Sequence, residues 1–293
     1  MSYEDRMLRN ALRKKRESQR NAMPTTLDWA MKKVDTINRD TTQGFQAPHF
    51  VDVYGTDTVL SDMHYVGNMR KKFSESSNES TEQTKKAADV LEAIIQDQAN
   101  TNSWLGDGVT VKKTSAYDDI KNGVDAIAEY PDSVDGSRVL ALGIDVTFGT
   151  NSIERKFDRI KKQIDEDRLA RVKYFESNDG NFKGTRNNIP RTIIGLSIKN
   201  ISDLARNWSS GEHDWLATHP AQFMLLQQID EQLKHMITYA QKKRSFTAER
   251  ELSRSLQTIE KIFNERENFD FGEDIPDRVH QEILRVSRET FRS

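Results

Sequence analysis

The sequence predicts a mixed α/β fold (α+β, with a mixed sheet) in which helices precede and follow a central group of strands. Three observations predict this class. Short, strand-like segments rich in apolar and β-branched residues gather in the middle of the chain, turn-forming residues separate them, and apolar residues recur at helical spacing on both sides. The pattern therefore predicts one α/β core with helical regions before and after it.

Composition limits the classes of protein to which the chain can belong. It has 293 residues, of which 35% are hydrophobic and 31% charged, and its formal net charge is −2. Any nucleic-acid binding must therefore depend on local basic patches rather than on overall charge. The absence of cysteine excludes disulfides, thiolate zinc sites and cysteine nucleophiles, and it favours the cytoplasm. No apolar segment approaches the roughly 20 residues that cross a bilayer, so we expect no membrane partner.

Residues 1–73 are predicted to form a basic N-terminal arm and a helix. The first 23 residues contain seven arginines and lysines against three acidic residues. Such an arm either contacts phosphates or forms a solvated terminus. A helix is predicted from about Thr26 to Asn38, and His49–Tyr54 has the pattern of a short strand, with loop or irregular helix around it.

A polar stretch at residues 74–83, SESSNESTEQ, marks the predicted start of a core that spans residues 80–200. Apolar residues at helical spacing then predict a helix over residues 84–99. Glu92 lies near the buried face of this helix, so it is either a metal ligand or an ordinary solvated residue. The segment VTVKKTS that follows is predicted to be a strand.

The next two predicted strands, at about residues 123–130 and 138–148, are joined by the turn-forming segment PDSVDG. An amphipathic helix begins near residue 151. Strands over residues 169–176 and 191–198 complete the core, and the basic segment between these last two strands is interpreted as a loop.

Acidic residues interrupt the two central strands. The second strand, VLALGIDVTF, is almost wholly apolar but contains Asp145, and the first strand contains Asp125. A carboxylate inside a buried strand is costly unless it is paired or binds a metal. Two of them on adjacent strands therefore indicate a divalent-cation site. The alternative for Asp145 is that it ends the strand and accepts hydrogen bonds from loop amides.

Residues 201–293 are predicted to form a helical region. Its helices are expected over residues 201–208, 221–242 and 248–266, with a last helix near the C-terminus. The short link between the second and third predicts an antiparallel pair. The residue pattern leaves three roles open for this region, which are to cover the core, to hold a partner, or to build a homo-oligomer.

The order of helix, acidic β-hairpin, strand, helix and strand resembles the core of the PD-(D/E)XK nuclease superfamily, the restriction-endonuclease-like fold. That family places an aspartate at the start of the second core strand, and an acidic residue, one intervening residue and a lysine on the third. Asp125, in NGVD, matches the first position, and Asp145, in GIDVT, matches the second acidic position. Thr147 stands where the lysine is expected, and Lys156 on the following helix is the expected substitute.

The resemblance implies a metal-dependent nuclease that hydrolyses phosphodiester bonds in nucleic acid, with DNA as the expected substrate. Asp125, Asp145 and Asp119 would hold Mg²⁺ or Mn²⁺, which polarises the phosphate and activates a water. Lys156 would stabilise charge in the transition state. Because Thr147 has no positive charge, the competing prediction is a non-catalytic nucleic-acid-binding or structural protein on a degenerate nuclease fold.

Overall fold

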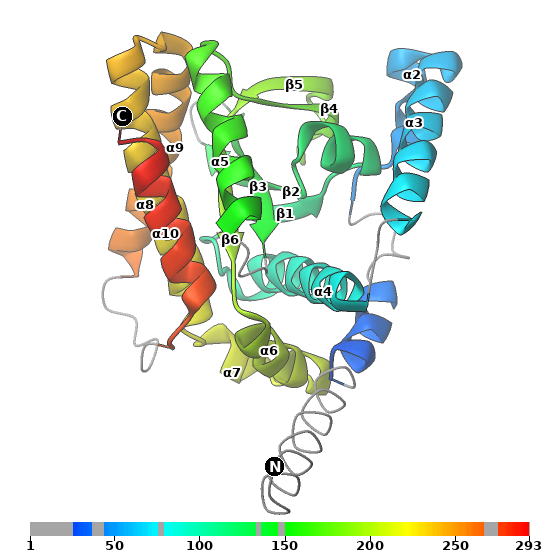
Figure 1. Ribbon diagram of the computed structural model, residues 1–293, viewed down its shortest axis with the longest axis vertical. Coiled ribbons are helices and arrows are strands. Elements are labelled where there is room, and N and C mark those ends of the chain that lie inside the picture. Colours follow the sequence, from blue (N-terminus) through cyan, green and yellow to red (C-terminus); the bar gives the residue numbers. More distant parts are fainter. Residues whose placement is uncertain are drawn as a thin grey trace, which may run out of the picture.

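The computed structural model describes residues 26–36, 44–75, 79–132, 136–145, 150–266 and 275–292. It is a mixed α/β structure, as predicted, with a small sheet at the centre and helices around it (Figure 1). The main hydrophobic core runs from the helix over residues 26–36, through the sheet, to the C-terminal helix. Because the core is continuous, the C-terminal helices pack on the rest of the chain.

The central sheet has four strands in the order β1 (Thr110–Lys113), β2 (Ala126–Asp132), β3 (Gly136–Asp145) and β6 (Arg191–Gly195). β1 pairs with β2, and β2 with β3, in antiparallel fashion, whereas β6 runs parallel to β3. The four predicted strands are confirmed, with shifted ends. β2 begins at Ala126, so Asp125 lies directly before the strand rather than inside it.

A second sheet pairs β4 (Ala170–Glu176) with β5 (Lys183–Ile189) in antiparallel fashion. The interpretation of the basic segment before β6 as a loop was therefore wrong. β5 reads KGTRNNI and has a single large apolar residue, so it has no alternation by which a sequence pattern identifies a strand. It is a strand because β4 supplies its hydrogen-bond partners.

The segment that precedes the core is helical. η2 (Ala47–Phe50), α2 (Val51–Tyr54) and α3 (Thr56–Glu75) follow one another, so the strand predicted over residues 49–54 is wrong. A proline stands in the first turn of η2, where a missing N–H costs nothing. Gly55, at φ +76°, then ends α2.

The two helices that border the sheet within the core are α4 (Glu79–Asn102) and α5 (Thr150–Asp165). α4 begins about one turn earlier than predicted. Each buries the stripe of apolar residues on which its prediction rested: Ala87, Val90, Leu91, Ile94 and Ile95 in α4, and Ile153, Phe157, Ile160 and Ile164 in α5. The connection from β3 to β6 contains α5 and then the β4–β5 pair, and this long crossover allows β6 to run parallel to β3.

The C-terminal helices are α6 (Ile198–Ser210), α7 (His213–Ala217), α8 (Ala221–Lys243), α9 (Phe246–Glu265) and α10 (Arg278–Thr290). α8 and α9 pack as the predicted antiparallel pair, and α10 packs against α5 and α8 (Figure 1). None of the helices that the structure describes is both long and apolar enough to cross a membrane.

Two glutamines of α8 cover the edge of the central sheet. The side-chain amide of Gln228 bonds both the N–H and the C=O of Gly195, at 2.9 Å each. Gln232 does the same to Ile193, at 2.8 and 2.7 Å. Because these amides satisfy the outer edge of β6, the edge is closed to pairing with another strand.

Candidate functional site

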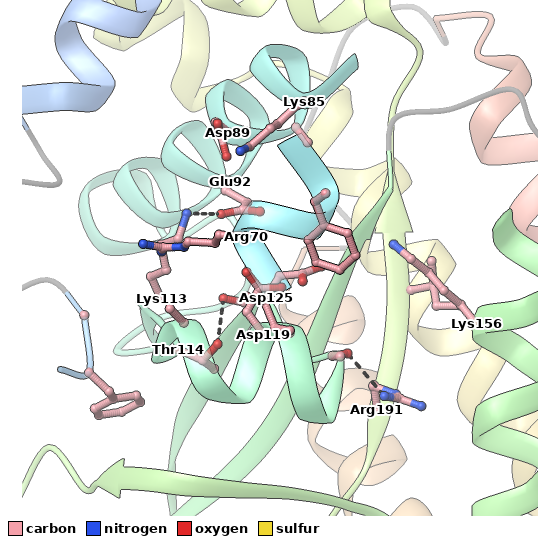
Figure 2. A pocket seen from close by; sticks show the side chains of 18 of the residues that line it. Arg70, Lys85, Asp89, Glu92, Lys113, Thr114, Asp119, Asp125, Lys156 and Arg191 are labelled. Atoms are coloured by element: carbon pink, nitrogen blue, oxygen red, sulfur yellow. Dashed lines mark hydrogen bonds and ion pairs between the residues drawn. The ribbon is translucent and has the colours of Figure 1, made fainter. Parts of the chain in front are cut away.

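A pocket of about 1010 Å³ lies between α4, α5 and the start of β2, with the end of α3 at its border. Among the described residues, four acidic side chains line it: Asp89, Glu92, Asp119 and Asp125. Basic side chains line it on both sides of these acids. Figure 2 shows Arg70 and Lys113 on one side of the carboxylates and Lys156 and Arg191 on the other.

The position of Asp125 is set by the segment that joins η3 (Asp118–Asn122), a π-helical turn, to β2. The C=O of Asp125 accepts a hydrogen bond from the Thr114 N–H at 3.0 Å, which fixes it against β1. Gly123, at φ +66°, ends the turn, and its N–H bonds the Asp119 C=O. This tight reversal brings Asp119 and Asp125 together, although six positions separate them.

The carboxyl groups of Asp119 and Asp125 lie close enough to interact directly. The pKa of Asp119 is raised to about 7, first because the pocket removes its carboxyl from water and second because Asp125 lies beside it. Asp119 is nevertheless an exposed residue, and it lines the pocket. Two carboxyls in contact cannot both ionise freely, so they hold either a shared proton or a cation.

Glu92 of α4 and Lys113 of β1 form an ion pair of 2.6 Å between Oε2 and Nζ, at the back of the same acidic group (Figure 2). Burial raises the pKa of Glu92 to about 8, with Lys113 opposing the rise and Asp125 adding to it. The pKa of Lys113 is also raised: burial acts to lower it, but the neighbouring carboxyls of Glu92, Asp89 and Asp119 together outweigh burial. Glu92 is thus a pocket residue with a specific partner, and not a solvated one.

The opposite side of the pocket is basic. Arg155, Lys156 and Arg159 lie on α5 at helical spacing, and Arg191 begins β6. Arg191 is 4% exposed, and its guanidinium donates to the backbone C=O of Asn122 at 3.0 Å. Burial and, to a smaller extent, the neighbouring Arg159 lower its pKa to about 10, while Asp125 acts in the opposite direction.

The structure brings three of the predicted site residues, Asp125, Asp119 and Lys156, to this pocket. Asp145 is the last residue of β3, and its backbone lies opposite Gly195 of β6. Its side chain, and the whole of Thr147, lie outside the described part of the structure. The convergence of Asp125 and Asp145 therefore stays a prediction. No cluster of three or more His, Cys, Asp or Glu with a metal-binding arrangement occurs among the described side chains.

Two acidic residues near Asp125 in the sequence have structural roles instead. Asp118 is fully buried, and its carboxylate accepts hydrogen bonds from the N–H groups of Lys173 and Tyr174 at 2.7 and 3.0 Å. Glu129 of β2 accepts a hydrogen bond from the Asn178 N–H at 3.1 Å, and it does not line the pocket. Both carboxylates join β4 or the turn after it to the central part of the fold.

Sequence reasoning did not assign several further charged residues to the site, among them Lys113, Arg191 and Asp89. Lys113 carries a weak signal, because it belongs to the predicted strand VTVKKTS next to the acidic hairpin. Arg191 stands at the start of an apolar strand, TIIG, where a buried cation is unusual. Asp89 lies one turn before Glu92 on α4, and no pattern in the sequence distinguishes it from a solvated residue.

Comparisons with protein-family models, with curated proteins and with solved structures found no match to this chain.

Proposed function

We propose that this chain is a metal-dependent phosphodiesterase that hydrolyses nucleic acid, with DNA as the expected substrate. The observation that carries the proposal is the contact between the Asp119 and Asp125 carboxyls in a pocket that also has a basic wall. A pair of carboxylates can coordinate a divalent cation, and a group of basic side chains can bind a phosphate. Phosphodiester hydrolysis is a reaction that uses both in one place.

The carboxyl pair has the chemistry that Mg²⁺ or Mn²⁺ requires. Mg²⁺ is commonly held by one or two carboxylates, with waters and substrate phosphates in the remaining positions, so a pair of aspartates is sufficient. Asp119 and Asp125 would hold the ion, and Asp145 at the end of β3 is the candidate for a third ligand. When bound, the ion polarises the phosphate and makes a water more acidic.

The basic residues would orient the phosphate and offset its charge. Lys156 on α5 is the proposed replacement for the lysine that the resemblance expects on β3. Lys113 is a second candidate, because β1 holds it beside Glu92, 2.6 Å away, in the same pocket. A cation that faces the reacting phosphate stabilises the charge that develops in the transition state.

The arrangement of the strands supports the same proposal. α4 precedes three antiparallel strands, α5 follows them, and β6 then returns parallel to β3. This order shares with the resemblance a helix before the acidic hairpin and another after it, whereas β1 before the hairpin and the β4–β5 pair between α5 and β6 differ from it. Asp125 stands immediately before the second strand, as the family's first aspartate does.

The test is a cleavage assay with labelled single- and double-stranded DNA and RNA, in Mg²⁺, in Mn²⁺ and in EDTA. We expect cleavage in the presence of the metal, and a loss on the order of 100-fold or more in Asp125→Asn. Lys156→Gln and Lys113→Gln show which lysine acts on the phosphate. The matched control is Asp158→Asn, which changes an exposed aspartate of α5.

Two results would contradict the proposal. Cleavage that Asp125→Asn leaves at the wild-type rate would place the activity elsewhere or in a contaminant. Binding of nucleic acid without cleavage in any metal would favour the alternative, a non-catalytic binding protein on the same fold.

A further inference from the structure

Two guanidinium groups border the same point of the pocket. A Cβ atom placed on Gly123 would lie 3.3 Å from Cζ of Arg159 and 3.4 Å from Nη1 of Arg191. Both arginines line the pocket, although they come from α5 and β6. Gly123 lets them come close to the backbone, since any side chain at this position would collide with Arg159.

The acceptors of these two guanidiniums are uncharged. Arg191 donates to the C=O groups of Asn122 and Gly123, at 3.0 and 3.2 Å, and to the side-chain oxygen of Gln163, at 3.3 Å. Arg159 donates to the C=O of Lys121, at 2.5 Å. Within the described part of the chain, neither guanidinium forms an ion pair with a carboxylate.

Two neighbouring guanidiniums repel each other, and Asp125, which favours the charged form of Arg191, offsets only part of that repulsion, so an anion bound between them would be favourable. Arg191 is almost completely buried, and the charge of Arg159 lowers its pKa in addition to the effect of burial. The pKa of Arg159 is likewise lowered, mainly by desolvation. Hydrogen bonds to carbonyls orient the two groups but do not neutralise them. The site therefore has the charge and the N–H donors to bind an anion.

Donor groups remain available for such a ligand. A guanidinium has five N–H groups, and the described structure gives Arg159 one acceptor. Arg159 is also the more exposed member of the pair, so a ligand entering the pocket meets it first. Arg191 lies behind it and adds a fixed positive charge.

The two positive charges of Arg159 and Arg191 favour a phosphomonoester over a phosphodiester as the ligand. An internal phosphodiester has one negative charge, whereas a phosphomonoester has about −1.5 to −2 and three free oxygens. Two adjacent guanidiniums match the second better than the first. The pocket, at about 1010 Å³, has the size of a site for one small ligand or the end of a strand rather than the width of a duplex.

We propose that Arg159 and Arg191 bind the terminal phosphomonoester of a nucleic-acid strand, so that the chain acts on phosphorylated ends. This inference rests on the proposed function for its substrate class, since phosphate groups on other molecules have the same chemistry. It assigns the arginine pair and the carboxyl pair to different phosphates. The arginines hold the terminal group, and the carboxyl pair lies where an adjacent phosphodiester would be hydrolysed.

The inference is tested by binding in EDTA, where no metal-dependent hydrolysis occurs. Three 12-nucleotide single strands of one sequence with the same internal fluorescent label are compared: a 5′-phosphate, a 3′-phosphate, and hydroxyls at both ends. Fluorescence anisotropy should show that one phosphorylated strand binds about tenfold more tightly than the hydroxyl strand. The 5′ and 3′ forms identify which end is recognised.

Variants assign the preference to the arginine pair. Arg159→Gln should bind all three strands equally, and Arg159→Lys should retain part of the preference because it keeps the charge. The matched control Arg206→Gln changes an arginine of α6 whose side chain is 67% exposed and lies outside the pocket, and it should behave as wild type. Thermal melting of each variant confirms that these changes leave the fold intact.

The outcomes separate this inference from the proposed function. Equal binding of the three strands by the wild type, or a preference that persists in Arg159→Gln, would overturn the assignment. A preference for phosphorylated ends without cleavage in any metal would retain the end-binding site and remove the nuclease. Metal-dependent cleavage without a preference for phosphorylated ends would support the nuclease and rule out the end-binding site.

Discussion

Replacing Asp118 by asparagine tests how the fold positions the pocket. Oδ1 of this buried carboxylate accepts hydrogen bonds from the Lys173 N–H and from the Asn122 side chain, both at 2.7 Å. Oδ2 accepts from the Tyr174 N–H at 3.0 Å and from the Ser115 hydroxyl at 2.8 Å. The carboxylate thus ties β4 to the π-helical turn that brings Asp119 to the pocket.

The expected loss can be worked out from these four bonds. Asparagine retains one acceptor oxygen, but its NH₂ group then faces one backbone N–H and one further donor. The hydroxyl of Ser115 can rotate to accept, whereas the N–H of Tyr174 cannot. A buried donor left without a partner costs about 1–3 kcal/mol, and exchanging a charged acceptor for a neutral one weakens the remaining bonds. We expect a total loss of about 2–4 kcal/mol in the free energy of unfolding.

Urea unfolding and thermal melting measure this loss, with Asp158→Asn as the control on the exposed face of α5. At about 2–4 °C per kcal/mol, Tm should fall by about 4–16 °C in Asp118→Asn and stay unchanged in the control. Metal binding to the folded variant should also weaken, because the turn that carries Asp119 loses its anchor. A variant as stable as wild type would refute the role assigned to these hydrogen bonds.

Two further predictions concern the edge of the sheet and the carboxyl pair. Gln232→Leu leaves the N–H and C=O of Ile193 without their partner, so the free energy of unfolding should fall by about 2–4 kcal/mol, whereas Gln257→Leu on the exposed face of α9 should cost little. In EDTA, the free energy of unfolding should fall as pH rises from about 4 to about 7, because the folded Asp119 keeps its proton to a pKa of about 7 and the unfolded one loses it near 3.8. Asp119→Asn should make this dependence shallower, and an unchanged slope would contradict the raised pKa.

Helical spacing allowed most of the fold to be predicted from the sequence. Ile153, Phe157 and Ile160 recur on one face of α5, and all three are buried against the core. The same regularity located the paired helices α8 and α9. Burial of one face is a local requirement, so it leaves a periodic pattern that can be identified without knowing the neighbouring elements.

The elements that were missed depend on partners that are distant in the sequence. β5 is polar and becomes a strand through pairing with β4. The segment over residues 49–54 looks apolar enough for a strand, yet Phe50 and Tyr54 pack as parts of a helical turn against Tyr174, with ring centroids 5.3 and 5.5 Å away. In both cases tertiary contacts decide between structures that the local sequence permits.

Some residues of the candidate site could be predicted from the sequence, and others could not. Asp125 and Asp119 were predicted because they are acidic residues beside a buried strand, and Lys156 because of the resemblance to a nuclease core. All three line the pocket. Lys113 and Arg191 were not predicted, because a cation becomes part of a site only through the elements that fold around it. The roles of Asp145 and Thr147 remain predictions.

The central claim is that Asp119 and Asp125 together hold a divalent cation, and calorimetric titration with Mn²⁺ tests it most directly. Because the ligands must lose their shared proton, the affinity should rise as pH increases toward about 7 and then level off. We predict one site in the wild type, no measurable binding in Asp125→Asn, and unchanged binding in Asp158→Asn. Binding of Mn²⁺ by Asp125→Asn with wild-type affinity, or no binding by the wild type at pH 8, would contradict the claim.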